Sequence, residues 1–394
     1  MGSFPIYPFR EKVKFWNNRP GLTTTWNYNL AYALAKIPDL EVHFLTHAPL
    51  LRTKVLEDKG LFIHFVGHLP KLDKIDRITN LQYGRFNMTR HLRALDPDIV
   101  HGSGTDHEYG YIAVESGYPH VVTVHGVMKE VGRTCPPARN SVVWNYIAKE
   151  PSVIKQTDYL IAINPYVEQQ FPEFSGVSFQ ISNAISPEFF SRGAEQIEKT
   201  NDLLFAGSVY PLKRVKNILA AMHQLRLSGR KVSLRVAGGV SNSVYMSELE
   251  TFIQQHELSD CVTFLGPLPQ AEIAHEMQKS RCLVLPSIQE TAPMVIAEAQ
   301  VMGLPVIATD VGGIKYMVED GVSGFVIEPD NIDMLADRIE KILSDKPLRE
   351  SMSSNARKAA MQYHPDVVAE KTAAVYREIL RKRSDVSVLE LEKR

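Results

Sequence analysis

Short apolar segments alternate with segments of helical spacing along almost the whole chain. In the first half, the apolar runs that predict strands cover 42–45, 61–66, 99–101, 121–124 and 159–162. In the second half they cover 203–206, 232–237, 262–265, 282–285, 305–308 and 324–327. Most of these runs are continuously apolar, which is typical of parallel strands that helices bury on both faces.

The segments between these runs have apolar residues at helical spacing, as at Leu335, Ile339 and Ile342. Repeated strand–helix units predict an α/β fold of doubly wound parallel sheets. More strands are predicted than one open sheet comfortably holds, so we expect two sheets. The polar stretch 182–201 contains no strand-like run and predicts the boundary between them. Ligands of such sheets bind beyond the carboxyl ends of the strands, so a ligand is expected between the two domains.

Composition excludes several classes of protein. The chain has 394 residues, of which 44% are hydrophobic and 23% charged, so it is not disordered throughout. With 44 basic and 45 acidic residues the net charge is -1, and the basic field of a nucleic-acid partner is absent. We therefore expect no nucleic acid among its partners.

The cysteines, the absence of long apolar runs and the first residues indicate where in the cell the protein is expected and how its sequence begins. The three cysteines, Cys135, Cys261 and Cys282, form no disulfide or zinc pattern and are expected to be free, buried thiols. No apolar run reaches the length of a membrane span, and no signal peptide begins the chain, so a cytoplasmic location is expected. Residues 1–9 have the character of a loop that follows a strand. We therefore expect that the first strand is missing from this sequence.

A segment near residue 290 combines a strand end, a helix start and two carboxylates. A polar loop presents Glu290, and a helix begins near Pro293 with Thr291 as its expected cap. Amides at a helix start can bind a phosphate or pyrophosphate. Glu298 follows Glu290 by eight residues and can accept both hydroxyls of a ribose, whereas Glu290 can reach a sugar beside the phosphate. On spacing alone, two solvent-facing helix glutamates are an equal alternative.

The same region resembles a known family. The spacing Glu290-x7-Glu298, followed by GLPVIATDVGGIKYMVEDGVSGFVIEPDN, is similar to glycosyltransferase family 4, the group 1 glycosyltransferases with the GT-B fold. The resemblance is strong over 201–380 and weaker in the N-terminal half. It implies that Glu298 binds the nucleotide ribose and that Glu290 contacts the donor sugar. Met294 and Val295, at the helix start, are expected to bind the donor.

The resemblance also implies an architecture. It implies two Rossmann-like domains facing across a cleft: an acceptor-side domain at 1–185 and a nucleotide-sugar donor domain at 186–362. A C-terminal helix at 363–394 is expected to cross back to the N-terminal domain. Many family members have Gly-Phe-Gly where this chain has Thr291-Ala292-Pro293. Because proline has no N–H, contacts to the donor sugar can differ here, and the identity of the sugar stays open.

A second segment, LLFAGSVYPLKRVKNILAA, joins a strand to a helix through Gly207 and a basic loop, and Gly207 is expected to bind the donor. Lysine at such a turn suits a phosphate, and the resemblance places Lys213 on the donor diphosphate. Many family members have arginine after the glycine, where this chain has Ser208. Arg214 and Lys216 are the candidate replacements for that charge. A solvated basic helix start is the alternative for these residues.

Two motifs in the N-terminal half complete the candidate set. His125 ends the run VVTVHGV, at the strand end where an open sheet places ligands, and it matches the family histidine at the donor sugar. A hydrogen-bonded loop histidine is its alternative. Gly21 lies in the loop NNRPGLTTTW, which can bring amides near an anion, although a plain turn into the helix explains it nearly as well. The predicted catalytic residues are therefore His125, Lys213 and Glu290.

These residues predict a retaining transferase that moves a sugar from a UDP- or GDP-sugar to an acceptor hydroxyl in glycan or polysaccharide biosynthesis. No cofactor or metal is expected, because the one Asp-x-Asp motif, Asp96-Pro97-Asp98, precedes a strand. The acceptor is open: a glycan, a lipid-linked glycan or a small molecule. The basic end of the last helix suits anionic lipid, and a solvated helix end is the alternative. A sugar phosphorylase and an inactive donor-binding subunit are the other candidate functions.

Overall fold

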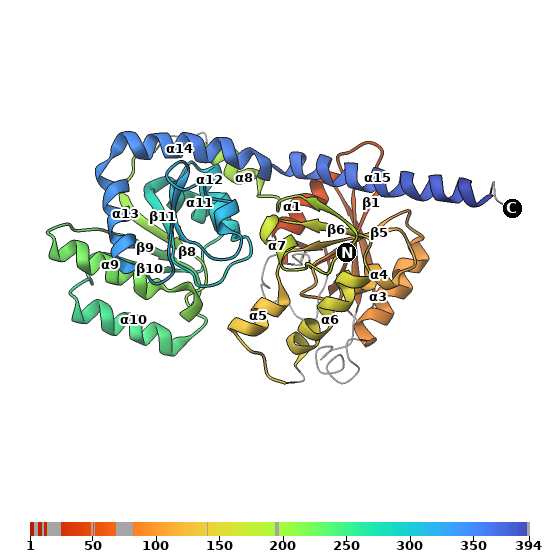
Figure 1. Cartoon of the computed structure of the whole chain (residues 1–394), viewed down its shortest axis with the longest axis horizontal. Coiled ribbons are helices and arrows are strands. Elements are labelled where there is room, and N and C mark those ends of the chain that lie inside the picture. Colours follow the sequence, from red (N-terminus) through yellow and green to blue (C-terminus); the bar gives the residue numbers. More distant parts are fainter. Residues whose placement is uncertain are drawn as a thin grey trace. The chain divides into compact units, whose positions relative to one another are not determined.

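The computed structural model describes residues 1–3, 7–9, 12–13, 25–48, 50, 52–67, 82–139, 141–193 and 197–391. The chain divides into two compact units (Figure 1). Unit 1 consists of Met1–Ala184 and Pro365–Arg394, and unit 2 is Ile185–His364. Each unit combines a largely parallel sheet with helices, so the predicted α/β class is confirmed.

The described residues of unit 2 form a six-stranded parallel sheet in the order β10-β9-β8-β11-β12-β13. The strands are β8 (Asn201–Ala206), β9 (Leu234–Ala237), β10 (Val262–Gly266), β11 (Ser280–Leu285), β12 (Val306–Thr309) and β13 (Gly324–Ile327). From β8 the chain proceeds to one edge of the sheet and then returns through β11 to the other. The topological switch point therefore lies between β8 and β11, where a ligand is expected beyond the strand ends.

Helices cover this sheet (Figure 1). α9 packs against α10 and α13, whereas α8 packs against α11 and α12. In α9 the residues Ile218, Leu219, Met222 and Leu225 are buried, as their helical spacing predicts. The helices are α8 (Pro187–Gly193), α9 (Val215–Leu227), α10 (Ser243–Gln255), α11 (Gln270–Lys279), α12 (Met294–Val301), α13 (Ile332–Ser344) and α14 (Lys346–Ala360). Short 3₁₀ turns are η2 (Pro211–Lys213), η3 (Ile314–Tyr316) and η4 (Met361–Tyr363).

Within the described part of unit 1 the strands form two groups, β1-β3-β2 and β4-β5-β6-β7. They are β1 (Val42–Ala48), β2 (Lys54–Asp58), β3 (Leu61–Gly67), β4 (Val100–Ser103), β5 (His120–Val124), β6 (Tyr159–Ala162) and β7 (Val177–Gln180). Every run predicted as a strand is a strand. The apolar pattern missed β2, which is antiparallel to β3, and β7, because both are edge strands without a continuous apolar run.

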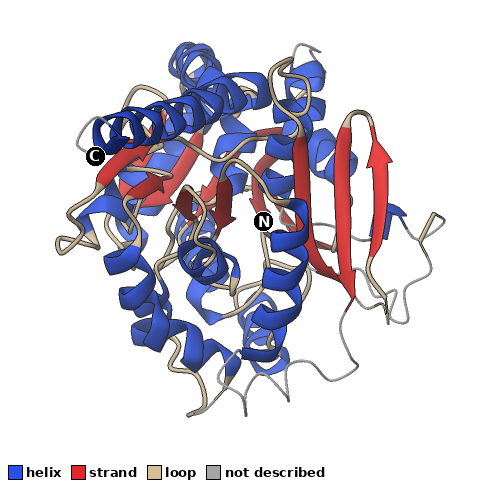
Figure 2. Cartoon of the chain, turned by 90° about the vertical axis from the view of Figure 1, so that its right-hand side faces the viewer, coloured by secondary structure: helices blue, strands red, loops and turns tan. Residues whose placement is uncertain are grey.

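Residues Met1–Ser3 lie between the two strand groups of unit 1. Met1 donates from its amino group to the carbonyl of His101 at 2.6 Å and accepts from the N–H of Ser103 at 2.8 Å. On the other side, the N–H of Gly2 donates to the carbonyl of Leu45 at 3.2 Å. These three residues therefore connect β1 with β4, and Figure 2 shows the amino terminus among the strands.

The helices of unit 1 are η1 (Tyr7–Phe9), α1 (Thr25–Leu34), α3 (Gln82–Leu95), α4 (Tyr109–Glu115), α5 (Met128–Thr134), α6 (Val142–Gln156), α7 (Pro165–Gln169) and α15 (Pro365–Leu391). α15 packs against α1, and its Val368, Ala373 and Tyr376 are buried with Leu34 in one apolar cluster. Among the described residues, no helix has the length and apolarity needed to cross a bilayer. Cys261 and Cys282 are buried as predicted, whereas the prediction that Cys135 is buried is wrong: this residue is the C-cap of α5 and is exposed.

Candidate active site

Two glycines lie at the carboxyl ends of β8 and β9. Gly207 follows β8 with a φ of 155°, and Gly238 follows β9 with a φ of 149°. The N–H of Gly207 donates to the carbonyl of Ala237 at 2.9 Å. A Cβ on Gly238 would lie 1.9 Å from the carbonyl oxygen of Gly207. The backbones approach so closely that only glycine fits, and Gly238 carries no sequence signal beyond its place after a strand.

The loop after β8 brings Lys213 to Glu290. The N–H of Ile288 donates to the carbonyl of Leu212 at 2.9 Å, which joins the loops that follow the two strands at the switch point. Lys213 Nζ donates to Glu290 Oε1, and the two side chains are 17% and 10% exposed. The structure thus brings two of the three predicted catalytic residues into direct contact beyond the strand ends.

Arg214 has a different carboxylate partner. Its backbone is left-handed, with a φ of 50°, and its Nε donates to Asp330 Oδ1 at 3.1 Å. The amide of Asn217 donates to the same oxygen at 2.9 Å. The two basic residues predicted from the loop are therefore paired separately, Lys213 with Glu290 and Arg214 with Asp330.

Helix α12 begins at Met294, and its N-cap residue is Pro293. The prediction that Thr291 caps this helix is wrong: proline has no side-chain oxygen to accept from the first-turn amides, and no such cap bond forms. The first-turn amides of a helix have no intrahelical acceptor. Met294 and Val295 therefore contribute N–H groups that can bind an anion at this end of α12.

Glu298 lies one turn further along α12 and is partly buried. Within the part of the chain that the structure describes, its carboxylate has no hydrogen-bond or ion-pair partner. Burial raises the pKa of Glu298 from 4.5 to about 7. A buried carboxylate without a partner is costly, and hydroxyl donors from a ligand would stabilise its charged form. Ser287, at the end of β11, also has a buried hydroxyl without a partner among the described residues.

In unit 1, His125 lies just beyond the end of β5 and is held by two side chains. Its Nε2 is 2.7 Å from Ser103 Oγ, and its Nδ1 is 2.8 Å from Asn183 Oδ1. Ser103 also donates to Asn27, at 2.5 Å. Burial lowers the pKa of His125, so the ring is neutral near pH 7. The sequence identified the histidine but not Ser103, Asn27 or Asn183, since these lie far apart along the chain.

A buried histidine–glutamate contact lies near the carboxyl ends of β1 and β4. His47 Nε2 is 2.7 Å from Glu108 Oε1, and the hydroxyl of Tyr146 donates to Glu108 Oε2 at 3.0 Å. Burial acts to raise the pKa of Glu108, but His47 and His107 outweigh it and lower the pKa to about 2. No motif pointed to this pair, because its members are far apart in the sequence.

Two predicted features remain, Gly21 and the Asp96-Pro97-Asp98 motif. Gly21 lies outside the described residues, so its predicted role stays a prediction. Asp96 and Asp98 lie between α3 and β4, at the amino end of that strand, and Asp96 accepts from the hydroxyl of Tyr118 at 2.9 Å. Among the described residues, no group of three or more His, Cys, Asp or Glu side chains is arranged to hold a metal ion.

Comparison with known families accounts for most of the chain. Residues 188–359 match the family model Glycosyl transferases group 1, and residues 23–189 match the model Glycosyltransferase Family 4. The chain belongs to the family 4, group 1 glycosyltransferases. It is therefore an enzyme that transfers a sugar from a nucleotide sugar, and its two α/β units are the Rossmann-like domains of the GT-B fold.

Three similar proteins illustrate this membership. An uncharacterized glycosyltransferase of Methanocaldococcus jannaschii is 24% identical over 356 residues, which cover 87% of this chain and 92% of that protein. The structure of sucrose-phosphate synthase from Thermosynechococcus elongatus has a TM-score of 0.75 at 19% identity, covering 92% of this chain and 94% of that one. Anabaena HepE in complex with UDP-glucose has a TM-score of 0.62 at 18% identity, covering 80% and 86%.

Proposed function

We propose that unit 2 binds a UDP-sugar, with Glu298 accepting the ribose hydroxyls. The observation that carries this is the partly buried Glu298 carboxylate, which has no partner among the described residues and lies one turn into α12. A diol can donate two hydrogen bonds to one carboxylate, which would stabilise its charged form. A uridine donor is favoured over guanosine because a structurally similar protein, Anabaena HepE, is a complex with UDP-glucose.

Lys213 and the amides of Met294 and Val295 would stabilise the diphosphate. In the proposed retaining reaction, an acceptor hydroxyl attacks the anomeric carbon on the face from which the diphosphate leaves. The bond between that carbon and the phosphate oxygen breaks, and the departing phosphate takes the hydroxyl proton. Charge grows on the diphosphate, where a fixed ammonium group and helix amides are most effective. Glu290, held by Lys213, would contact the donor sugar.

The acceptor is proposed to bind unit 1 at the carboxyl ends of β1, β4 and β5. Polar side chains from all three strand ends gather there, including the His47–Glu108 pair and His125. They offer hydrogen-bond partners to a hydroxyl-rich acceptor. His125 has both ring nitrogens engaged within unit 1, so its proposed role is to position the surrounding groups.

Calorimetry with UDP, GDP and ADP tests the donor assignment. We expect UDP to bind the purified chain more tightly than GDP or ADP. We also expect Glu298→Gln to weaken the binding of UDP by about 1.5–3 kcal/mol, the range for hydrogen bonds to charged groups. Glu250→Gln is a matched control, because Glu250 is an exposed glutamate on α10. Equal UDP affinity in the Glu298 and Glu250 variants would reject the ribose assignment.

A further inference from the structure

Glu150 is a buried carboxylate that no step of the proposed reaction uses. It lies on α6, and the residue is 1% exposed. Burial raises the pKa of Glu150, although hydrogen bonds from neighbouring groups act to lower it. Burying an acid is costly, and a glutamine of similar shape would bury no charge. The presence of a carboxylate here therefore points to a local requirement for two acceptor oxygens.

Three hydrogen bonds reach this carboxylate from two loops. The hydroxyl of Thr105 donates to Glu150 Oε1 at 2.7 Å, and the N–H of Met128 donates to the same oxygen at 3.0 Å. The N–H of Lys129 donates to Oε2 at 3.2 Å. Thr105 lies in the loop after β4, whereas Met128 and Lys129 begin α5 after β5. Since β4 and β5 are neighbouring parallel strands, Glu150 connects two loops at the carboxyl end of the same sheet.

Helix α5 depends on Glu150 for the acceptor at its amino end. Its N-cap residue is Val127, whose side chain makes no cap bond. The first-turn amides of a helix have no intrahelical acceptor, and a negative charge is favourable beside them. The ammonium group of Lys129 does not pair with Glu150, because it donates to the carbonyl of Gln170. Loss of the Glu150 carboxylate would therefore leave the start of α5 without its acceptor.

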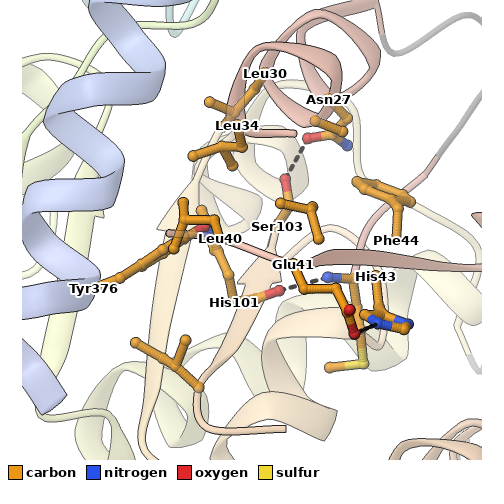
Figure 3. Close-up of a pocket in the computed structure, with 14 residues that line it drawn as sticks. Asn27, Leu30, Leu34, Leu40, Glu41, His43, Phe44, His101, Ser103 and Tyr376 are labelled. Carbon is orange, nitrogen blue, oxygen red and sulfur yellow. Dashed lines mark hydrogen bonds and ion pairs between the residues drawn. The ribbon is translucent and has the colours of Figure 1, made fainter. Parts of the chain in front are cut away.

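The start of α5 is the backbone that carries His125. Two residues separate His125 from Met128, so the turn between them is short. The imidazole itself is bonded to Ser103 and Asn183. Figure 3 shows Ser103 with its further hydrogen bond to Asn27. The place of the ring thus depends on these side chains and on the turn that Glu150 holds.

The loop after β4 borders the same ring. A Cβ on Gly104 would lie 3.9 Å from His125 Cδ2, and the N–H of Gly104 donates to the carbonyl of Thr123 at 2.9 Å. Thr105, the next residue, is the one that donates to Glu150. Both backbone segments that flank the imidazole are therefore joined to one carboxylate.

We propose that Glu150 is a positioning residue for His125, holding the loop after β4 and the start of α5 together. This inference rests on the proposed function of unit 1, which assigns the ends of β4 and β5 to the acceptor. Glu150 is not a catalytic residue, because it is buried and both its oxygens accept from the chain itself. Its effect on sugar transfer passes through the position of the imidazole.

Nuclear magnetic resonance of the histidine rings tests the proposal in the full chain without substrate. Glu150→Ala removes both oxygens, and Glu150→Gln keeps one. Val153→Ala is the matched control, because Val153 is 3% exposed one turn further along α6 and is buried in an apolar cluster. We expect the ring signals of His125, assigned with His125→Gln, to shift most in Glu150→Ala and less in Glu150→Gln. They should stay at the parent positions in Val153→Ala.

Hydrolysis of UDP-glucose, with water as the acceptor, gives the kinetic readout. We expect kcat to fall by about 10- to 100-fold in Glu150→Ala, since small displacements of an active-site group have effects of this size. The loss should be smaller in Glu150→Gln. KM should change by less than about twofold, because the nucleotide is proposed to bind unit 2. Val153→Ala should leave both values near those of the parent chain.

Parent-like His125 signals in Glu150→Ala would overturn the proposal. An equal fall of kcat in Glu150→Ala and Val153→Ala would also overturn it, because Glu150 would then only support the fold. If Glu150→Ala does not fold, Glu150→Gln is judged by the same two criteria. Absence of UDP-glucose hydrolysis in the parent chain would count against the proposed function, and the His125 signals would still decide the role of Glu150.

Discussion

At the residue scale, the proposed donor site of unit 2 contains an ion pair, Lys213 with Glu290, and a carboxylate without a partner among the described residues, Glu298. Lys213 and Glu290 compensate each other's charge at a position that is mostly shielded from water. Glu298 has no such partner among the described residues. A bound diphosphate would compete with Glu290 for Lys213. A bound ribose would instead supply the hydrogen-bond donors that the Glu298 carboxylate lacks.

Glu290→Gln separates sugar transfer from nucleotide binding. A carboxylate beside Lys213 repels a diphosphate, so UDP should bind the variant at least as tightly as it binds the parent chain. Transfer from a UDP-sugar should fall by about 100-fold or more, as for loss of a polar group that acts on the transition state. Calorimetry and initial rates measure the two quantities, with Glu250→Gln as control. Weaker UDP binding would mean that Glu290 contacts the nucleotide.

The pH dependence of stability tests the environment of Glu298. Because burial raises its pKa from 4.5 to about 7, the folded protein binds this proton more tightly than the unfolded chain does. Stability contributed by the neutral acid is therefore lost as the pH rises from 4.5 through 7. Glu298→Gln removes this loss, so the variant should gain on the order of 1–3 kcal/mol relative to the parent between pH 5 and pH 8. Urea unfolding of the ligand-free chain measures the free energy of unfolding of variant and parent at pH 5 and at pH 8. If the difference between variant and parent were the same at both pH values, the raised pKa would be contradicted.

At the element scale, the ends of β8 and β9 depend on a contact between two backbones. A side chain on Gly238 would collide with the carbonyl of Gly207, whereas a Cβ on the adjacent Gly239 meets no atom within 4 Å. The loop that carries Lys213 starts from this contact. Local backbone geometry is thereby coupled to the position of a proposed phosphate-binding residue.

Gly238→Ala should destabilise unit 2 by about 3 kcal/mol or more, because the new methyl group must displace backbone in a conformation that alanine rarely adopts. Where the variant folds, it should also bind UDP more weakly, since the start of the Lys213 loop shifts. Gly239→Ala is the matched control and should change both quantities little. Denaturant unfolding and calorimetry measure them, and similar effects of the two substitutions would refute the argument.

The last helix provides a second test at this scale. Val368 of α15 is 2% exposed within the apolar cluster of unit 1, whereas its neighbour Val367 is 37% exposed. Val368→Asp should destabilise unit 1 by about 3–5 kcal/mol through an unpaired buried carboxylate, and Val367→Asp should cost less than about 1 kcal/mol. Hydrogen exchange resolves the effect by unit. Loss of protection in unit 2 that equals the loss in unit 1 would show that the cluster does not belong to unit 1 alone.

At the scale of the whole molecule, the source of positive charge for the diphosphate decides whether a metal is needed. In the proposed site, Lys213, once a diphosphate displaces Glu290 from it, and the start of α12 would supply that charge within unit 2. The Asp96-Pro97-Asp98 motif lies at the amino end of β4, which is the end opposite to that of a doubly wound ligand site. Together, these two observations predict that turnover does not require a divalent cation.

We expect sugar transfer to survive EDTA, and Asp98→Asn to affect folding more than turnover. Activity with and without chelator, followed by addition of Mn²⁺ or Mg²⁺, measures the first. Thermal melting beside initial rates measures the second. Loss of activity in EDTA that a divalent cation restores would overturn the metal-independent assignment.

The α/β class, the continuously apolar strands and the family could all be predicted from the amino-acid sequence. These features are local: a run of buried residues and the spacing of Glu290 and Glu298 are properties of one segment. The edge strands β2 and β7 escaped prediction because half-exposed strands lack a continuous apolar run. The predicted cap of α12 was wrong because the N-cap residue is Pro293 and not Thr291.

Which residues from distant parts of the sequence meet depends on the folded arrangement of the strands. Lys213 pairs with Glu290 because β8 and β11 are neighbours in the sheet, although the two residues lie 77 positions apart. The partners of His125, the His47–Glu108 pair and the contact between Gly207 and Gly238 likewise arise where separate strands end side by side. Sequence patterns report the burial of single elements, whereas the order of strands in a sheet determines which strand ends share a site.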